Sequence, residues 1–182
     1  MTRIDVGSVL RNSANVPYGD LVTRPTGAAV RRIIERELAS MHEGDVATLD
    51  FTHIGMMDYS CADEVVAKLL LAFDSPDARS GSVIFHGITD AHLEAIEVVL
   101  HHHGLALVVQ FADGGTRLVG AVSHQERDAW EAVLARGALG ADEVATVVGG
   151  DRAASARVLD ALVRRRLLRH DGTAYYPPGA VR

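Results

Sequence analysis

One segment, Leu49 to Glu64, constrains the fold more strongly than any other part of this chain. It continues an apolar run, 46–51, whose length and composition are typical of a buried strand. An acidic turn follows, and Ser60 stands where a helix is expected to begin, because the apolar residues beyond it recur at helical spacing. Those residues are Val65, Val66, Leu69, Leu70 and Phe73. A strand that leads directly into an amphipathic helix predicts a sheet with helices packed on it.

Ser60 has two interpretations. As a helix N-cap, its hydroxyl accepts a hydrogen bond from the backbone N–H of Asp63, in a capping box where Asp replaces the usual Glu or Gln. As a regulatory residue, a hydroxyl at a helix start, beside carboxylates, is well placed to receive or lose a phosphate. The residues alone do not decide between the two.

The part of the chain before Ser123 alternates strands with amphipathic helices. Strands are predicted at 2–10, 46–51, 82–86, 105–111 and 116–122, and helices at 26–41, 62–73 and 89–103. Thr89 is a favourable N-cap and Gly104 a favourable stop for the last of these helices. Polar breaks are expected at 12–18 and 74–77. The predicted fold class is therefore mixed α/β, and the pattern does not decide which strands are parallel.

At Ser123 the pattern changes to three helices in succession, predicted at 125–136, 141–148 and 151–168. A strand pair around the Asp171-Gly172 turn follows. The buried positions expected here are Trp130, Val133, Leu134, Val144, Val147, Val158, Leu159, Leu162, Leu167 and Leu168. These features predict two small domains, residues 1–122 and residues 123–182, of which the second is of the α+β class.

Charge differs between the two parts. Residues 1–123 hold 9 Lys and Arg against 16 Asp and Glu, a net charge of −7, whereas residues 124–182 hold 9 against 8, a net charge of +1. The acidic first part argues against nucleic-acid binding there. The single cysteine excludes an internal disulfide, and no apolar run reaches the roughly 18 residues of a membrane span. Because the chain also lacks a signal-peptide core, we expect a cytoplasmic protein.

Neither a metal site nor a catalytic site is expected. His101, His102 and His103 are consecutive on a helix, so they point about 100° apart and cannot share one ion from that helix alone; they suit the helix C-terminus instead. Cys61 is expected to be packed and neutral, although a helix start stabilises a thiolate. The chain lacks phosphate-binding-loop, nucleophile-elbow and zinc-protease motifs, and Lys68 is its only lysine. We therefore expect a protein that is not an enzyme and binds no cofactor.

The segment Asp58-Tyr59-Ser60-Cys61 resembles part of the STAS domain, the fold shared by sulphate-transporter tails and anti-sigma factor antagonists. In those domains an Asp-Ser-Ser-Gly segment follows a hydrophobic strand, and an anti-sigma kinase phosphorylates its second serine. Ser60 matches that serine and Asp58 the acidic residue, whereas Tyr59 and Cys61 depart from the pattern. The run from Ser60 to Val65 is more similar to an uncharacterised bacterial STAS-like family with a Ser-Phe-Ala-Asp-Glu type motif.

This resemblance covers about residues 20–122 and implies a partner-switching mechanism. The unmodified protein would bind a kinase-type ATPase or an anti-sigma-like factor, and phosphorylation of Ser60 would release that partner. The residues implied in phosphorylation or partner binding are Ser60, Asp58, Tyr59, Asp63 and Glu64. The first hypothesis for function is therefore a bacterial signalling protein that acts as a partner-binding switch.

The order of helix, helix, longer helix and strand pair in residues 123–182 resembles a winged helix-turn-helix domain. The run from Val158 to Arg169 is similar to the recognition helix and the start of the wing in many bacterial repressors. In those proteins a glycine usually precedes the paired leucines, and here Arg166 takes that place.

A second hypothesis follows from this resemblance: a DNA-binding transcription regulator whose STAS-like domain senses a ligand or dimerises. It implies that Arg152, Ser155 and Arg157 face a major groove. Contacts to phosphates are implied for Arg164, Arg165, Arg169 and His170. The alternative is that these arginines form a solvated helix face and that the domain pairs with protein, since a charge of +1 is low for a DNA-binding domain. The sequence leaves open whether the chain forms a homo-oligomer.

Overall fold

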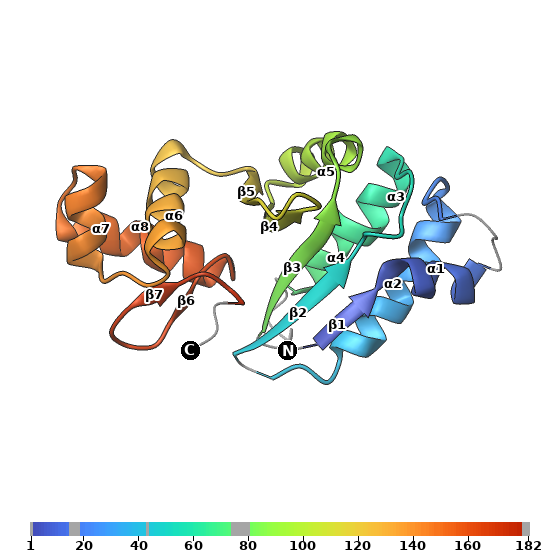
Figure 1. The fold of residues 1–182 in the computed structure, drawn as a ribbon, viewed down its shortest axis with the longest axis horizontal. Coiled ribbons are helices and arrows are strands. Elements are labelled where there is room, and N and C mark those ends of the chain that lie inside the picture. Colours follow the sequence, from blue (N-terminus) through green and yellow to red (C-terminus); the bar gives the residue numbers. More distant parts are fainter. Residues whose placement is uncertain (1, 15–18, 43, 74–80, 180–182) are drawn as a thin grey trace. The chain divides into compact units, whose positions relative to one another are not determined.

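The structure, a computed structural model, describes residues 2–14, 19–42, 44–73 and 81–179. The chain divides into two compact units, Met1–Ala121 and Val122–Arg182 (Figure 1). This division lies next to Ser123, where the character of the sequence changes. Of the predicted polar breaks, residues 15–18 and 74–77 lie outside the described residues, and residues 12–14 belong to a helix.

The first unit contains a five-stranded mixed sheet with the strand order β1-β2-β3-β4-β5. The strands are β1 (Thr2–Asp5), β2 (Asp45–Asp50), β3 (Gly81–Ile88), β4 (Ala106–Phe111) and β5 (Thr116–Gly120). β1 to β4 are parallel to one another, and β5 runs antiparallel to β4. The predicted mixed α/β class is confirmed, and a STAS-like arrangement stays a prediction.

Helices connect the parallel strands, because parallel neighbours cannot be joined by a tight hairpin. In chain order they are α1 (Val6–Ala14), α2 (Arg24–Leu38), α3 (Tyr59–Ala62), η1 (Asp63–Lys68), α4 (Leu69–Phe73) and α5 (Asp90–His103). Right-handed crossovers between strands in sequential order place their helices on the same face of a sheet. Leu49, Phe85 and Val109, from three neighbouring strands, share one apolar core with these helices.

The predicted strand 2–10 is wrong beyond Asp5, where the chain turns into α1. The Asp5 carboxylate accepts hydrogen bonds from the backbone N–H of Ser8 at 3.2 Å and from the Ser8 hydroxyl at 2.8 Å. This is helix-cap geometry. The buried residues Val6, Val9 and Leu10 then recur at helical spacing. A local cap therefore overrides the β-branched composition of the segment.

Two other helices begin at sequence signals. Thr23 caps α2 by accepting a hydrogen bond from the backbone N–H of Thr26 at 3.3 Å, and Pro25 occupies the first turn. Thr89 caps α5, and Gly104 ends it in a left-handed conformation with φ of 67°. The predicted limits 89–103 are thus confirmed within a residue, whereas α2 ends before the predicted limit of 26–41.

The helix that contains Ser60 is one continuous helical segment with a π-helical centre. α3, η1 and α4 follow one another without a break from Tyr59 to Phe73, so the helix begins before the predicted residue 62. The segment packs against both α2 and α5. As a result its central residues are buried in succession: Glu64, Val65, Val66 and Ala67. This packing brings a carboxylate into the interior of the unit.

The second unit contains α6 (His124–Arg136), α7 (Ala141–Val148), α8 (Arg152–Arg164), β6 (Arg169–His170) and β7 (Tyr175–Tyr176). β6 and β7 pair antiparallel. Leu139, between α6 and α7, forms a further antiparallel bridge with Tyr175 through backbone hydrogen bonds of 3.0 and 2.8 Å. The predicted order of three helices and a strand pair is confirmed, with one extended residue added between the first two helices.

The core of the second unit surrounds Trp130, whose indole N–H donates to the carbonyl oxygen of Leu167 at 3.1 Å. Other buried apolar residues are Val133, Val144, Leu159, Leu162 and Leu168. Leu134 and Val158, also expected to be buried, are half-buried. Two other expectations are wrong. The third helix ends at Arg164 rather than 168, and Arg166 beyond it has a left-handed φ of 60°. Val147 is 51% exposed, because the opposite face of the short helix α7 already fills the core.

Candidate functional site

The loop that leads from β2 to α3 is held by the segment that leads into α2. The backbone N–H of Leu21 donates to the carbonyl of Met56 at 2.8 Å, and that of Asp58 donates to the carbonyl of Leu21 at 2.9 Å. Leu21 and Met57 therefore form a parallel bridge. The starts of α2 and α3 are thereby fixed side by side, and this fixes where Asp58 stands.

Asp58, rather than Ser60, is the N-cap of this helix, so the predicted capping role of Ser60 is wrong. One carboxylate oxygen of Asp58 accepts a hydrogen bond from the backbone N–H of Cys61 at 2.8 Å. The backbone N–H of Asp63 donates to main-chain carbonyls instead of to the Ser60 side chain. Asp and Ser are both favourable caps, and the loop geometry places Asp58 at the position where capping occurs.

The Ser60 hydroxyl lies in the first turn of the helix and is half-buried. It donates to the Asp58 carboxylate, at 2.9 Å from Oδ1 and 3.1 Å from Oδ2. A hydroxyl that donates to a carboxylate is arranged for general-base assistance, in which the carboxylate takes the proton as the oxygen attacks. The Asp58 carboxylate therefore fixes the direction of the Ser60 hydroxyl, and the sequence reasoning did not identify it as the acceptor.

Asp63 and Glu64 lie one turn further along and belong to an ion-pair network. Asp63 contacts Arg24 at 2.7 Å and the imidazole of His103 at 2.9 Å. Burial raises the pKa of Asp63, but the hydrogen bonds from Arg24 and His103 and the charge of Lys68 outweigh it and lower this pKa to about 2. Asp63 is therefore a structural anion that links α2, η1 and α5.

Glu64 is buried and contacts three cations. Arg24 lies 3.1 Å from one carboxylate oxygen, Arg31 lies 3.3 Å from the other, and the ammonium of Lys68 is also bonded to it. Burial raises the pKa of Glu64, and the bonds from Lys68, Arg24 and Arg31 more than compensate, so this pKa is lowered. A buried carboxylate needs such partners. Glu64 therefore holds α2 against the π-helical segment, and its burial keeps it from a surface contact.

Gly27 explains how α2 approaches this segment so closely. A Cβ at residue 27 would lie 3.1 Å from the Cα of Cys61 and 3.1 Å from the Cβ of Glu64. The thiol of Cys61 donates to the carbonyl of Thr23 at 2.9 Å. Burial, followed by the charge of Asp58, raises the pKa of this thiol to about 11. The prediction of a packed, neutral Cys61 is confirmed.

Tyr59 is the predicted site residue that faces solvent. Its side chain is half exposed, and its hydroxyl donates to Glu94 of α5 at 3.1 Å. The hydrogen bond to Glu94, followed by the charge of Glu94, raises the pKa of this phenol. Tyr59 therefore connects the start of α3 with the outer face of α5.

His92 is a residue of this region that the sequence reasoning missed. It is fully buried, and its Nδ1 accepts a hydrogen bond from the backbone N–H of Thr89 at 3.4 Å. Its Nε2 then carries the proton and donates to the carbonyl of Gly55 at 3.3 Å. The signal was present in the sequence, because His92 stands at the position of a capping box that Glu or Gln usually fills.

The other histidines of α5 do not gather around a common point. His103 bonds to Asp63, and its ring packs edge-on against His102 at a centroid distance of 4.8 Å. In the part of the chain that the structure describes, no three His, Cys, Asp or Glu side chains are grouped so that they could hold a metal ion.

In the second unit, four of the predicted DNA-binding residues lie on α8, and they do not share one exposed face. Arg157 and Arg164 are exposed on the same side of the helix, one full heptad apart. Asp160 lies between them and accepts a hydrogen bond from the hydroxyl of Tyr175 at 2.7 Å. Ser155 is buried, so its predicted position on the exposed face is wrong.

The remaining predicted residues make contacts within the unit. Arg152 lies 3.4 Å from Asp142, Arg165 lies 3.0 Å from Glu126, and the guanidinium of Arg169 lies over the ring of Tyr176. His170 stacks on Tyr175 with ring centroids 4.2 Å apart. Arg165 is half-buried in its pair, whereas Arg152 is exposed and free to exchange partners.

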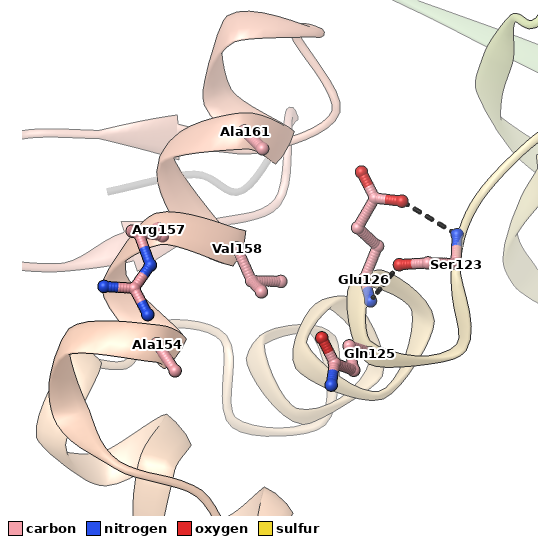
Figure 2. A pocket seen from close by; sticks show the side chains of 7 residues that line it. All are labelled: Ser123, Gln125, Glu126, Ala154, Arg157, Val158 and Ala161. Carbon is pink, nitrogen blue, oxygen red and sulfur yellow. Dashed lines mark hydrogen bonds between the residues drawn. The ribbon is translucent and has the colours of Figure 1, made fainter.

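A shallow hollow lies between the start of α6 and one side of α8 (Figure 2). Its volume is about 290 Å³, and it is lined by Ser123, Gln125, Glu126, Ala154, Arg157, Val158 and Ala161. Ser123 and Glu126 satisfy each other through a capping box, drawn as dashed lines in Figure 2. The hollow is at the small end of the range for ligand sites, and two of its polar lining residues already bond to each other.

Comparison of the chain with protein-family models, with curated proteins and with solved structures finds no match. Over the described residues, no helix combines the length and the apolar character needed to cross a lipid bilayer.

Proposed function

We propose that the chain is a bacterial signalling protein that binds a protein partner around Ser60 and releases it when Ser60 is phosphorylated. The observation that carries this proposal is the hydrogen bond of 2.9 Å from the Ser60 hydroxyl to Asp58. It orients a half-buried serine in the first turn of a helix, after the loop that follows strand β2. The resemblance of this segment to STAS domains supports the same assignment, with a kinase-type ATPase or an anti-sigma-like factor as the partner.

A phosphate on Ser60 would change the local structure as well as the charge. It adds about −1.5 to −2 charges and removes the proton that now bonds to Asp58. Two like charges about 6 Å apart repel by about 3 kcal/mol at an effective dielectric of about 20. Asp58 also caps the helix, so this repulsion acts on the capping carboxylate. Loss of the cap would cost about 1 kcal/mol of helix stability. Modification would therefore alter the first turn that the partner contacts.

The test compares Ser60→Asp with Ser60→Ala in capture of a kinase-type ATPase from the native host. We expect Ser60→Asp to lose capture by at least about tenfold and Ser60→Ala to retain it. Ser8→Asp is a matched control, because the Ser8 hydroxyl also donates to a capping carboxylate, that of Asp5 at 2.8 Å. Equal capture by both Ser60 variants, or equal loss in Ser8→Asp, would contradict the proposal.

DNA binding by the second unit is a second candidate, favoured by its chain order. A helix, an extended residue, two helices and a strand pair follow in sequence, and α7 and α8 are joined by a short turn that contains Gly149 and Gly150. The left-handed φ of Arg166 stands where similar repressors have glycine, the residue that adopts this conformation most readily. Both features support a winged helix-turn-helix assignment.

Fluorescence anisotropy with duplexes from upstream of the chain's own operon tests this candidate. We expect Arg157→Ala and Arg164→Ala each to weaken binding and to reduce the slope of log affinity against log salt by about 1. Arg136→Ala, an exposed arginine at the end of α6, is the control. A salt slope that neither Arg157→Ala nor Arg164→Ala changes, or that Arg136→Ala reduces equally, would remove α8 as the DNA-contacting helix.

A further inference from the structure

A patch of exposed apolar side chains adjoins Ser60. We call it the α5 patch, and it consists of Val22, Met56, Tyr59 and Val98, which are 44%, 59%, 50% and 52% exposed. Single exposed apolar residues are ordinary, but adjoining ones are a common feature of binding surfaces. The patch extends beyond the start of α3, because only Tyr59 belongs to that helix and the other residues come from neighbouring segments.

Hydrogen bonds connect the three segments that carry these residues. The bond of 2.8 Å from the Leu21 N–H to the Met56 carbonyl pairs the two segments, and the bridge between Leu21 and Met57 places Val22 diagonally across from Met56. The hydroxyl of Tyr59 reaches Glu94 at 3.1 Å. Val98 lies one helical turn after Glu94, so it stands next to the contact that Tyr59 makes with α5.

Acidic residues border this patch along α5. Asp90, Glu94 and Glu97 are all exposed, and their spacing places them on one side of the helix. α5 contains neither Lys nor Arg. Among the described residues, no cation lies within ion-pair distance of these three carboxylates. The surface therefore combines an apolar centre with an unneutralised acidic border.

We propose that the α5 patch docks a basic surface of the protein partner, in which Lys or Arg side chains surround a large apolar side chain. This inference rests on the proposed function, since it names the chemistry of the partner. A second copy of the chain would bring the same carboxylates against one another, and nucleic acid would bring further negative charge. The net charge of −7 over residues 1–123 steers a cationic partner toward this unit.

The probe is a random-peptide display library selected on the full-length native chain. We expect the enriched peptides to carry net positive charge and at least one large apolar residue. The best peptide, measured by anisotropy, should bind Glu97→Lys and Val98→Ser each about tenfold more weakly and should lose affinity as salt rises. Glu37→Lys and Leu71→Ser are matched controls, because both residues are exposed on other helices, and they should bind as the native chain does.

Three results would overturn the assignment: enrichment of acidic or uncharged peptides, equal losses in the controls, or self-association of the native chain that Glu97→Lys abolishes in sedimentation velocity. Ser60→Asp in the same assay separates this inference from the proposed function. If Ser60→Asp binds the basic peptide unchanged and also still captures the ATPase, the α5 patch stands and release by phosphorylation fails. If neutral peptides are enriched while Ser60→Asp still loses the ATPase, release stands and the basic partner is wrong.

Discussion

Replacing Asp63 by Asn tests whether the ion-pair network stabilises the first unit. Its pKa of about 2, against an ordinary value of 3.8, corresponds to about 2 kcal/mol of folding free energy at about 1.4 kcal/mol per pKa unit. The side chain is 19% exposed, so solvent screens this interaction only in part. We therefore expect Asp63→Asn to lower the free energy of unfolding by about 2 kcal/mol at neutral pH.

The same linkage fixes how this difference depends on pH. Folding lowers the pKa of Asp63, so its stabilisation is present above the unfolded value of 3.8 and is lost as the pH falls toward 2. The difference between native chain and variant should stay near 2 kcal/mol at about pH 5 and fall to about half of that at about pH 3.

Urea unfolding followed by far-ultraviolet circular dichroism measures the difference at each pH. Fluorescence of Trp130, the sole tryptophan, reports the second unit separately. Asp113→Asn is the control, since the carboxylate of Asp113 lies in an exposed turn and bonds only to the N–H of Gly115 in the described part of the chain. A difference below about 0.5 kcal/mol at neutral pH, or one that does not change with pH, would refute the reasoning.

Three further outcomes are expected. Gly87→Ala should destabilise the first unit by over about 2 kcal/mol in urea unfolding, because its Cβ would lie 2.4 Å from the Thr52 hydroxyl. Gly104→Ala is the control: its φ is similarly positive but the space around it is open, so it should cost about 1 kcal/mol. Burial lowers the pKa of His92, so the native chain should lose stability as the pH falls below about 6.5, and thermal melts of His92→Gln should lack this loss. Iodoacetamide should alkylate Cys61 at the rate of unfolding, because the thiol is buried with a pKa of about 11; rapid labelling of the folded chain would contradict this.

The sequence predicted most reliably what local contacts decide. α5 was located almost to the residue, because Thr89 and Gly104 end it through their own backbone and side-chain bonds. The strand predicted at 2–10 failed because the apolar residues after Asp5 satisfy either periodicity, and the cap bonds to Ser8 select the helix. Where two patterns fit, a single hydrogen-bonded residue determines the structure.

The candidate site depends on contacts that are distant in sequence, and these could not be predicted. Asp58 and Ser60 are both common caps, and pairing of Leu21 with the loop decides between them. The π-helical centre arises where the segment is packed between α2 and α5, which no periodicity of its own residues reveals. Arg24 and Arg31 neutralise Glu64 across a gap of more than thirty residues in the chain, which no local pattern reveals.

The backbone bridge between Leu21 and Met57 has a mechanical consequence. The bridge holds the segment before α2 against the segment before α3. Two further contacts join the first turns of these helices: the thiol of Cys61 bonds to the carbonyl of Thr23, and the guanidinium of Arg24 pairs with Asp63. Neither helix start is able to tilt alone without breaking these contacts. A displacement of the first turn of α3 by a change at Ser60 would therefore also displace the start of α2. Amide protons at both helix starts would then exchange with solvent at similar rates.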